Sequence, residues 1–469
     1  MSIRFGTDGW RALIAEEFTF AAVRRACAGI AKAMAAAEGP VVVGYDTRFL
    51  SRRFAETAAR TLMGAGRRVL LSDSACPTPA ASCHVVASQA AFGVVITASH
   101  NPAAFSGIKV KERTGASAGS EVTARCEQAV PEDLPPLADL EEGRSRALLE
   151  ETSFTPAHVE RLSRMVDLEG IRSAGLRVIV DPMHGAAGRL LERLLSGRNT
   201  QVSTVRSHPD PLFGGVHPEP LEQNLDGLRR AVLQAGGAVG FATDGDGDRI
   251  GAFDEQGRFV SPLRIAPLLA WSLIKKGRRG PLGKTFANTI LLDRVASRHG
   301  LPFSVFPVGF KHIAAELQAG RMLLGGEESG GIGVEGFIPE RDGTLVSLMI
   351  LQAMADEGKP LSALVEDLTR TFGELHYRRV DYPCPPEEGL RLVERLAASP
   401  PASVGGLKIT ACDPRDGLKL LFGDDGWLLF RPSGTEPVLR VYSEAPTPEL
   451  LEAVMSQAAT IVQHAMGNP

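Results

Sequence analysis

The sequence predicts a chain of several layered α/β domains. Its 469 residues are about three times the roughly 150 residues of one average domain, so we expect three domains or four. Short apolar runs of strand length alternate with longer stretches of helical spacing, which is the pattern of sheets covered by helices. With 44% hydrophobic and 23% charged residues, the chain has enough apolar side chains for several cores.

The first part of the chain alternates helices and strands. We expect helices over residues 19–37 and 53–65, and strands over residues 41–45, 68–71 and 92–96. Residues 107–111 then return along a neighbouring strand or loop and bring Lys109 toward Ser99. The acidic, proline-containing residues 129–149 are expected to form a connector that includes a helix.

Three further units follow. The second begins near residue 156, with strands over residues 176–180 and 238–243. The third begins near residue 258; its predicted helices cover residues 265–275 and 294–299, and its predicted strands cover residues 285–288 and 322–324. The last begins near residue 375, is rich in strands around residues 427–430, and ends in an amphipathic helix over residues 449–464.

Composition excludes several classes of protein. A net charge of −4 without a basic stripe argues against nucleic acid or an anionic membrane as the main partner. We expect no signal peptide, and no apolar run approaches the roughly 20 residues that a membrane span needs. Six scattered cysteines without a C-x-x-C pair indicate reduced thiols in a cytoplasmic protein.

The segment TASHNP (97–102) places Ser99 and His100 on a tight turn directly after the predicted strand 92–96. Ligands and catalytic groups collect at such strand ends in α/β folds. Ser99 is therefore a candidate nucleophile or phosphoryl carrier. The alternative is a polar turn in which Ser99 and Asn101 bond only to their own backbone.

The segment TDGDGDR (243–249) is the strongest chemical signal. Asp244, Asp246 and Asp248 alternate with glycines, so the loop can fold back until all three carboxylates face one cation. Oxygen ligands of this kind favour Mg²⁺, Ca²⁺ or Mn²⁺. An EF-hand is excluded because its sixth position holds Arg249 and a strand follows it. Arg249 is better placed to orient a carboxylate or to contact a phosphate.

Three more loops carry polar groups. FGTDGWR (5–11) presents Arg11, although a surface turn would explain it equally well. GGEESGG (325–331) presents Glu327 and Ser329, which suit hydrogen bonds to sugar hydroxyls, or else form an ordinary turn. RPSGTEP (431–437), with Arg440 beyond it, combines a guanidinium, hydroxyls and a glycine N–H and fits a phosphate clamp.

Residues 277–285 have the glycines and the Lys-Thr pair of a nucleotide P-loop. The spacing between Gly277 and Gly283 is one residue too long, and Pro281 removes a backbone donor. A P-loop also follows a strand and opens a helix, whereas this segment follows a helix. We assign it to a surface loop.

Together these loops resemble one family, the α-D-phosphohexomutases, which include phosphoglucomutases and phosphomannomutases. The resemblance covers essentially the whole chain, through FGTDGWR, TASHNP, TDGDGDR, GGEESGG and RPSGTEP in the family's order. It implies an α/β fold of three related layered α/β domains with mixed sheets and a smaller C-terminal α+β domain. The expected domains are a phosphoserine domain (1–153), a metal-binding domain (154–257), a sugar-binding domain (258–373) and a mobile phosphate-binding domain (374–469), the last acting as a lid.

The resemblance also assigns roles to residues. It makes Ser99 the phosphoserine, with a phosphoryl oxygen joining Asp244, Asp246 and Asp248 around Mg²⁺. The residues around the phosphoryl group are Arg11, His100, Lys109 and Arg249, and Lys109 is the best candidate for acid/base work. The sugar and its distal phosphate are assigned to Lys311, Glu327, Ser329, Arg431, Ser433, Gly434, Thr435 and Arg440. A hexose 1,6-bisphosphate is the expected activator, hexose phosphates are the expected partners, and the chain is expected to be a monomer or homodimer.

Two departures from the family pattern bear on sugar selectivity. Gly331 stands where many bacterial members have histidine, and Phe105-Ser106-Gly107 stands where many have Tyr-Asn-Gly. The Glu327-Glu328 pair is closer to glucose-preferring relatives, since the phosphoglucosamine branch has glutamine at the second position. We therefore expect a phosphoglucomutase. The alternatives are a phosphomannomutase or dual-specificity mutase, a glucose 1,6-bisphosphate synthase, a phosphatase with a phosphoserine intermediate, and a non-catalytic phosphosugar-binding protein.

Overall fold

The computed structural model describes residues 3–6, 8–433 and 437–465. The chain divides into two compact units, which are considered separately. The first contains the chain up to Pro281 together with Gly309–Leu364, and the second contains Leu282–Val308 and the chain from Val365 onward. Among the described residues, no helix has both the length and the apolar character required to cross a membrane.

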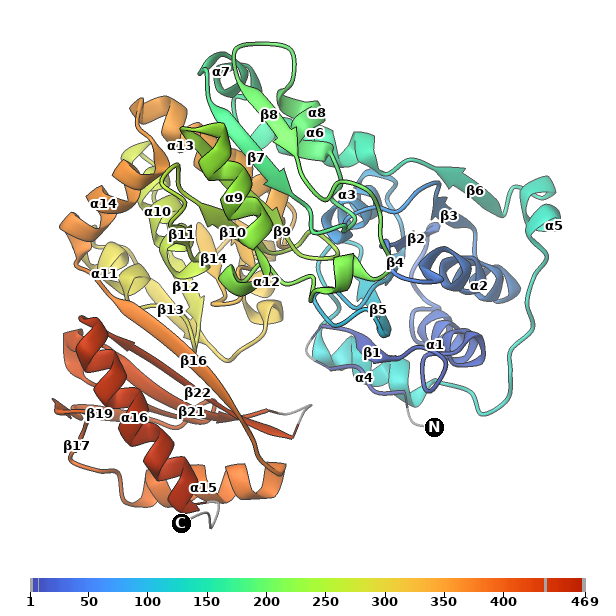
Figure 1. The fold of residues 1–469 in the computed structure, drawn as a ribbon. Helices are drawn as coiled ribbons and strands as arrows, with labels where there is room; N and C mark the ends of the chain where they lie inside the picture. The colour runs from blue at the N-terminus through green and yellow to red at the C-terminus, as the bar shows by residue number, and fades with distance from the viewer. Residues whose placement is uncertain (1–2, 7, 434–436, 466–469) are drawn as a thin grey trace. The chain divides into compact units, whose positions relative to one another are not determined.

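The first sheet of the first unit has six strands in the order β1-β5-β4-β2-β3-β6 (Figure 1). Its strands are β1 (Trp10–Leu13), β2 (Val41–Tyr45), β3 (Val69–Ser72), β4 (Phe92–Ile96), β5 (Phe105–Lys111) and β6 (Leu149–Thr152). The helices of this part are α1 (Phe20–Ala33), α2 (Ser51–Gly64), α3 (Thr78–Ala87), α4 (Ser120–Gln128) and α5 (Leu140–Ser145). The sheet is mixed, since β2 is parallel to β3 and β4 whereas β5 is antiparallel to β1 and β4.

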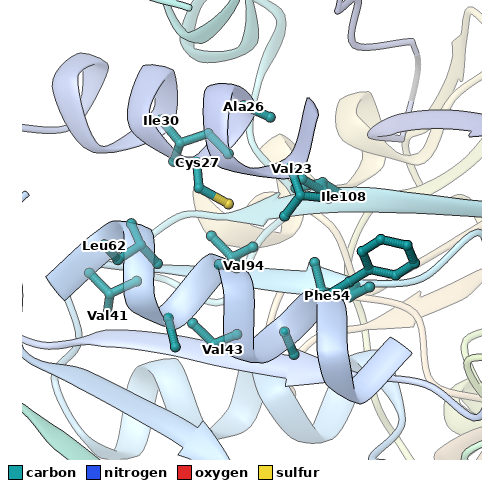
Figure 2. Close-up of a cluster of buried hydrophobic side chains, with 14 of the residues drawn as sticks. Val23, Ala26, Cys27, Ile30, Val41, Val43, Phe54, Leu62, Val94 and Ile108 are labelled. Atoms are coloured by element: carbon teal, nitrogen blue, oxygen red, sulfur yellow. The ribbon is translucent and has the colours of Figure 1, made fainter. Parts of the chain in front are cut away.

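Alternation along the strands separates two apolar cores, because successive side chains of a strand point to opposite faces of the sheet. Val41 and Val43 pack with α1 and α2, whereas Val42 packs with the α3 side chains. Figure 2 shows the first of these cores, with Val23, Ala26, Cys27, Ile30, Val41, Val43, Phe54, Leu62, Val94 and Ile108 labelled. Burial of each large aliphatic side chain contributes about 1.5–3 kcal/mol. The sheet is thus held from both faces, which fixes the positions of its strand ends.

The second sheet has five strands in the order β11-β10-β9-β7-β8. They are β7 (Arg177–Asp181), β8 (Gln201–Thr204), β9 (Ala238–Thr243), β10 (Ile250–Phe253) and β11 (Phe259–Val260). Around it lie α6 (Thr155–Met165), α7 (Leu168–Ser173), α8 (Leu190–Leu195), η1 (Phe213–Gly215), η2 (Glu222–Asn224) and α9 (Asp226–Ala235). Because β9 and β10 form an antiparallel hairpin that pairs Thr243 with Ile250, the loop between them is the acidic segment 244–249.

The first unit is completed by α10 (Pro262–Lys275), α12 (Phe310–Gln318), α13 (Gly343–Glu357) and the antiparallel pair β14 (Leu324–Gly326) and β15 (Ile332–Val334). Helix α14 (Leu361–Phe372) contains the boundary between the two units. The side chains of α13 are buried from Gly343 to Met354, so this helix is surrounded by protein on all sides over that length.

The second unit holds the parallel pair β12 (Leu282–Thr285) and β13 (Phe303–Phe306), with α11 (Leu291–Arg298) between them in the chain. Its main sheet has the order β16-β22-β21-β20-β19 and is antiparallel. The remaining elements are β16 (His376–Pro383), α15 (Pro386–Ala398), β17 (Ser403–Val404), β18 (Leu407–Lys408), β19 (Ala411–Asp413), β20 (Leu418–Leu421), η3 (Gly423–Asp425), β21 (Trp427–Pro432), β22 (Val438–Ala445) and α16 (Pro448–Ala465).

Three local predictions from the sequence are wrong. The predicted surface loop 277–285 ends in β12, whose residues are all buried, and the predicted strand 285–288 is therefore displaced toward the N-terminus. Leu282 pairs with Phe303 on the neighbouring strand. Lys284 is also buried, and its Nζ donates to the Thr289 carbonyl, which compensates for the loss of water. The predicted strand 322–324 is likewise shifted, since pairing across the turn starts at Leu324.

The predicted connector 129–149 contains α5, but it also leads into β6, which extends the first sheet by pairing in parallel with β3. Domain boundaries after residues 153, 257 and 373 remain a prediction.

Candidate functional site

The Ser99 turn lies directly beyond the carboxyl end of β4. The Ser99 N–H donates to Thr97 Oγ1 at 2.8 Å, and the Asn101 N–H donates to the Ala98 carbonyl at 3.0 Å. Ser99 itself has a φ of +53°, in the left-handed region that side chains other than glycine seldom adopt. Such a backbone persists only where its surroundings enforce it, and it is common at functional sites.

The acidic loop meets this turn from the second sheet. Ser99 Oγ donates to Asp244 Oδ2 at 2.8 Å. The other oxygen of Asp244 accepts from the backbone N–H groups of Asp248 and Arg249, at 2.9 and 3.1 Å, and this folds the loop back on itself. One carboxylate oxygen from each of Asp244, Asp246 and Asp248 consequently lies within 4.8 Å of the other two.

The donor set fits a divalent metal ion. All three carboxylates are almost completely buried, and within the described residues Asp246 Oδ1 and Asp248 Oδ1 have no hydrogen-bond partner. Burial, together with the neighbouring Asp248 and Asp246 charges, raises the pKa of Asp244 well above its usual range. Three crowded carboxylates with unused oxygens are a suitable site for a hard ion such as Mg²⁺. The geometry thus agrees with the metal site expected from TDGDGDR.

Lys109 reaches the same cluster from β5, which runs antiparallel to β4 and pairs Lys109 with Val95. Its Nζ lies 2.8 Å from Asp246 Oδ2, 2.8 Å from Asp248 Oδ2 and 2.9 Å from Asp8 Oδ2. Burial acts to lower the pKa of Lys109, but the carboxylates outweigh it and the pKa is raised. Lys109 is therefore a fixed positive charge within the acidic cluster that Ser99 contacts.

Arg341 is a residue that the sequence motifs missed. It precedes α13 by two positions, and its Nη2 lies 2.6 Å from Asp8 Oδ2 and 2.8 Å from Asp248 Oδ2. Its Nη1 donates to Glu327 Oε2 at 3.3 Å. One guanidinium thus joins the N-terminal segment, the acidic loop and the 325–331 turn. The available sequence signal was the charged run 340–342 in front of a helix too apolar to lie on a surface.

The other predicted cations lie around the same turn. His100 Nδ1 is 3.3 Å from Ser99 Oγ, and burial together with nearby cations lowers the pKa of His100 well below its usual range. Arg11 Nη1 donates to Asn101 Oδ1 at 2.7 Å. Arg249, on the acidic loop itself, pairs through Nη1 with Glu219 at 2.9 Å. The structure therefore brings all four predicted cationic or imidazole side chains to the Ser99 turn or to the loop that meets it.

Glu327 begins the turn between β14 and β15 and is buried against Arg341. Burial raises the pKa of Glu327 to about 7, although Arg341 opposes the shift. Ser329 lies half-buried on the same turn. Lys311 is at the start of α12, where its Nζ donates to Ser120 Oγ at 2.7 Å.

The packing of this turn explains why position 331 is a glycine. A Cβ at Gly331 would lie 2.4 Å from Arg341 Cδ and 2.8 Å from Glu327 Oε2, both closer than real Cβ atoms approach other atoms. The space that a side chain at this position would enter is filled here by Arg341. A histidine at position 331 would therefore collide with the Arg341 side chain as it lies in this structure.

The predicted phosphate segment belongs to the second unit. Arg431 on β21 stands directly opposite Arg440 on β22, so both side chains are on the same face of the sheet. Arg431 Nε donates to Asp416 at 2.9 Å, and Arg440 Nε lies 3.5 Å from Asp381. The Ser433 N–H donates to the Val438 carbonyl at 2.9 Å. Gly434 and Thr435, also predicted for this site, lie outside the described residues.

Comparison with known proteins decides the family. Models of all four phosphoglucomutase/phosphomannomutase domains match the chain: alpha/beta/alpha domain I over residues 2–135, domain II over 156–257, domain III over 262–372 and the C-terminal domain over 385–461. The chain belongs to the phosphoglucomutase/phosphomannomutase family. The fold class expected from the sequence, three α/β domains and a C-terminal domain, is thereby confirmed.

Relatives of this chain carry different substrate names. It is 33% identical to a Thermococcus kodakarensis phosphoglucomutase/phosphomannomutase, covering 98% of this chain and 99% of the relative. It is 30% identical to a Latilactobacillus sakei phosphoglucosamine mutase over 100% of both chains. A solved structure from Thermus thermophilus, provisionally described as a phosphomannomutase, is 35% identical with a TM-score of 0.88, covering 99% of this chain and 100% of that one. The family's members are phosphohexomutases, which are intramolecular phosphotransferases.

Proposed function

We propose that this enzyme interconverts α-D-glucose 1-phosphate and glucose 6-phosphate through a phosphoserine at Ser99 and a hexose 1,6-bisphosphate intermediate. The observation that carries the proposal is the 2.8 Å hydrogen bond from Ser99 Oγ to Asp244, a member of the buried three-carboxylate cluster. A serine that is only a polar turn has no need of a left-handed backbone, a buried hydroxyl and a convergent acidic loop. The hydroxyl is thus read as the carrier of the phosphoryl group.

Phosphoryl transfer needs positioned groups and charge neutralisation more than covalent chemistry from the protein. In the proposed step the P–Oγ bond of phospho-Ser99 breaks and a P–O bond to a free sugar hydroxyl forms. The proton that this hydroxyl loses is balanced by the one that Ser99 Oγ regains. Return of the other phosphate of the bisphosphate to Ser99 completes the isomerisation. Mg²⁺ held by Asp244, Asp246 and Asp248 would neutralise negative charge on the transferring group.

The basic side chains of the site have distinct parts in this proposal. Lys109 and Arg341 hold positive charge against the acidic loop, where their partners are Asp246, Asp248 and Asp8. His100 lies beside Ser99 Oγ, and Arg11 fixes Asn101 on the same turn. These positions support a role around the phosphoryl group for Lys109, Arg341, His100 and Arg11, to which we add Arg249 on the acidic loop. Lys109 stays the proposed acid/base residue.

We further propose glucose as the preferred sugar. Glu327 and Ser329 are expected to bind its hydroxyls together with Lys311, and the non-reacting phosphate is assigned to Arg431, Ser433, Gly434, Thr435 and Arg440. The opposed pair Arg431 and Arg440 supports this assignment, since two guanidinium groups on one sheet face suit a dianion. A cytoplasmic location, a monomeric or homodimeric state, activation by a hexose 1,6-bisphosphate and closure of the C-terminal domain as a lid remain parts of the same prediction.

A coupled assay across glucose, mannose and glucosamine 1-phosphates, with Mg²⁺ and a trace of the matching bisphosphate, tests the proposal. We expect the highest kcat/KM on glucose 1-phosphate and loss of turnover with EDTA. Ser99→Ala should lower kcat by at least about 10³-fold, because the phosphoryl carrier is gone. Full mutase activity in Ser99→Ala would overturn the mechanism, and a higher kcat/KM on another sugar would overturn the substrate.

The alternatives give different products in the same assay. A phosphatase would release inorganic phosphate steadily without forming glucose 6-phosphate. A bisphosphate synthase would accumulate glucose 1,6-bisphosphate from an external phosphoryl donor. A binding protein would bind the sugar phosphate and turn over none of them.

A further inference from the structure

Arg48 lies behind the Ser99 turn because of the order of strands in the first sheet. Strands β2 and β4 are parallel neighbours, with Tyr45 opposite Ile96, so the segments that follow them leave the sheet side by side. The Asp46 N–H donates to the Ile96 carbonyl at 3.0 Å and joins these two segments. Arg48, two residues further on, is thereby directed at the backbone of the Ser99 turn.

Both terminal nitrogens of the Arg48 guanidinium donate to that backbone. Its Nη2 donates to the carbonyls of Ser99 and Asn101, each at 2.6 Å. Its Nη1 donates to the carbonyls of Pro102 and Phe105, at 2.8 and 3.0 Å. Four carbonyls of a single loop, residues 99–105, therefore converge on one cation.

The surroundings hold the guanidinium in place. The Arg48 side chain is 0% exposed, and its Nε lies 3.1 Å from Asp46 Oδ2. The buried ring of Phe213 lies across it, with 4.9 Å between Cζ and the ring centroid. Arginine offers a planar set of donors in fixed directions, whereas the three donors of a lysine ammonium radiate from one point. Only arginine can serve these four acceptors together.

We propose that Arg48 is a positioning residue for phosphoryl transfer. It fixes the Ser99 carbonyl and thereby the left-handed conformation that presents Oγ to the acidic loop. Arg48 makes its contacts with backbone carbonyls and not with Ser99 Oγ, so it acts through the turn. The inference rests on the proposed role of Ser99 as the phosphoryl carrier.

The test compares Arg48→Lys with Arg67→Lys. Arg67 is a matched control, because its guanidinium also donates to backbone carbonyls, those of Ala37 and Met34, and lies over an aromatic ring, that of Phe92. Its loop carries none of the proposed site residues. For both variants, kcat and KM are measured on glucose 1-phosphate. The rate of phosphoryl uptake by Ser99 from glucose 1,6-bisphosphate is followed by intact-protein mass spectrometry.

We expect Arg48→Lys to lower kcat and the rate of Ser99 phosphorylation by on the order of 10²-fold, since displacement of a reacting atom by about 1 Å has this effect. KM should change by less than about threefold, because the Arg48 side chain is completely buried and so is not available to bind substrate. Arg67→Lys should keep wild-type rates. Equal rates in folded Arg48→Lys and Arg67→Lys would overturn the inference.

Two further measurements distinguish a folding defect, and a failure of the proposed function, from a failure of the Arg48 inference. If Arg48→Lys fails to fold, Phe213→Leu, which leaves the guanidinium but removes the ring over it, should slow Ser99 phosphorylation severalfold; wild-type rates in that variant would then overturn the inference. If wild-type protein takes up no more phosphoryl group than Ser99→Ala, the proposed function fails, and this outcome is distinct from a failure of Arg48 alone.

Discussion

At the scale of single residues, Thr78 shows how an uncharged side chain controls the acidic loop. Its Oγ1 donates to Asp246 Oδ2 at 2.6 Å, and its N–H donates to the Asp246 carbonyl at 2.9 Å. The hydroxyl thus fixes the direction of one proposed metal ligand. Groups that orient metal ligands commonly affect affinity by about 10- to 100-fold.

We therefore expect Thr78→Val to weaken Mg²⁺ binding by about 10- to 100-fold while the fold is kept, since valine has the same shape and the backbone bond remains. The measurement is the Mg²⁺ concentration that gives half-maximal activity. Thr61→Val is the control, because Thr61 is equally buried but donates to the Thr57 carbonyl within α2. An unchanged Mg²⁺ requirement in Thr78→Val would contradict the prediction.

The raised pKa of Glu327 predicts that the stability of the folded chain depends on pH. Burial raises its pKa from 4.5 to about 7, so between these values the folded chain keeps a proton that the unfolded chain has lost. Stability must then decrease as pH rises through this window, by on the order of 3 kcal/mol if Glu327 acts alone. Glu327→Gln, which is always neutral, should lose this part of the pH dependence. Thermal unfolding of both proteins from about pH 4.5 to 8 measures it, and parallel profiles would count against the assignment.

The residues of the site were accessible from the sequence to different degrees. Ser99 and the three aspartates stand in turns that follow strands, Lys109 stands on β5, and the structure brings these residues together. Asp8 and Arg341 could not be found in this way. Their importance depends on burial and on their mutual contact across 333 positions of the chain, and local spacing contains no such information.

At the scale of elements, α13 is the helix for which the sequence was least informative. It is apolar around its whole circumference, so it lacks the amphipathic period by which helices are recognised. Its start is nevertheless specified, because Asp342 accepts from the N–H groups of Thr344 and Leu345 at 2.8 and 3.0 Å. Asp342 also bonds to the buried His158, so this cap joins α13 to α6.

We expect Asp342→Ala to lower the free energy of unfolding by about 2–4 kcal/mol, the sum of a lost cap and a buried imidazole left without its partner. Asp139→Ala is a close control. Asp139 caps the exposed helix α5 through two backbone N–H groups at 2.8 and 3.0 Å and has no buried partner among the described residues. Its loss should cost less than that of Asp342, because no buried group is left without a partner. Equal losses in chemical denaturation would show that the bond to His158 contributes nothing.

Strand boundaries were the other weak point at this scale. The residues of β12 follow a run of Gly, Arg and Pro typical of loops, yet pairing with β13 makes Leu282–Thr285 a strand. Lys284, in the middle of this strand, breaks the apolar pattern expected of a buried strand. It is tolerated there because its ammonium donates to the Thr289 carbonyl and pairs with Asp293. Leu282–Thr285 is therefore a strand because it pairs with β13, and the local sequence gives no sign of that pairing.

At the scale of the whole molecule, the distribution of thiols predicts its chemical reactivity. Five of the six cysteines are buried and only Cys412 is exposed. Burial raises the pKa of Cys27 to about 12 and, as the leading cause in each case, that of Cys76 and Cys126 to about 11. Thiolate is the reactive form, so these groups are protected twice, by access and by protonation.

With Ellman's reagent at neutral pH we expect one fast equivalent from native protein and six after denaturation. Cys412→Ser should abolish the fast phase. Additional fast equivalents in the native protein would indicate that one of the apolar cores opens readily.

The overall architecture was predictable because it depends on regular alternation of strands and helices over hundreds of residues. Length alone suggested three or four domains, and models of four domains match the chain. The division into two compact units was not predictable, since residues 282–308 join the later part of the chain by side-chain packing around Phe286 and Trp427. Such packing has no sequence period.

The left-handed backbone of Ser99 has a consequence for which hydroxyl can serve there. Threonine carries the same chemical group, but its branched Cβ is a true outlier at a φ of +53°. Ser99→Thr should therefore keep a hydroxyl and still lose most of the enzyme's turnover, whereas a site chosen only for its nucleophile would accept either residue. The backbone conformation at residue 99 therefore favours serine over threonine, although both carry the same hydroxyl group.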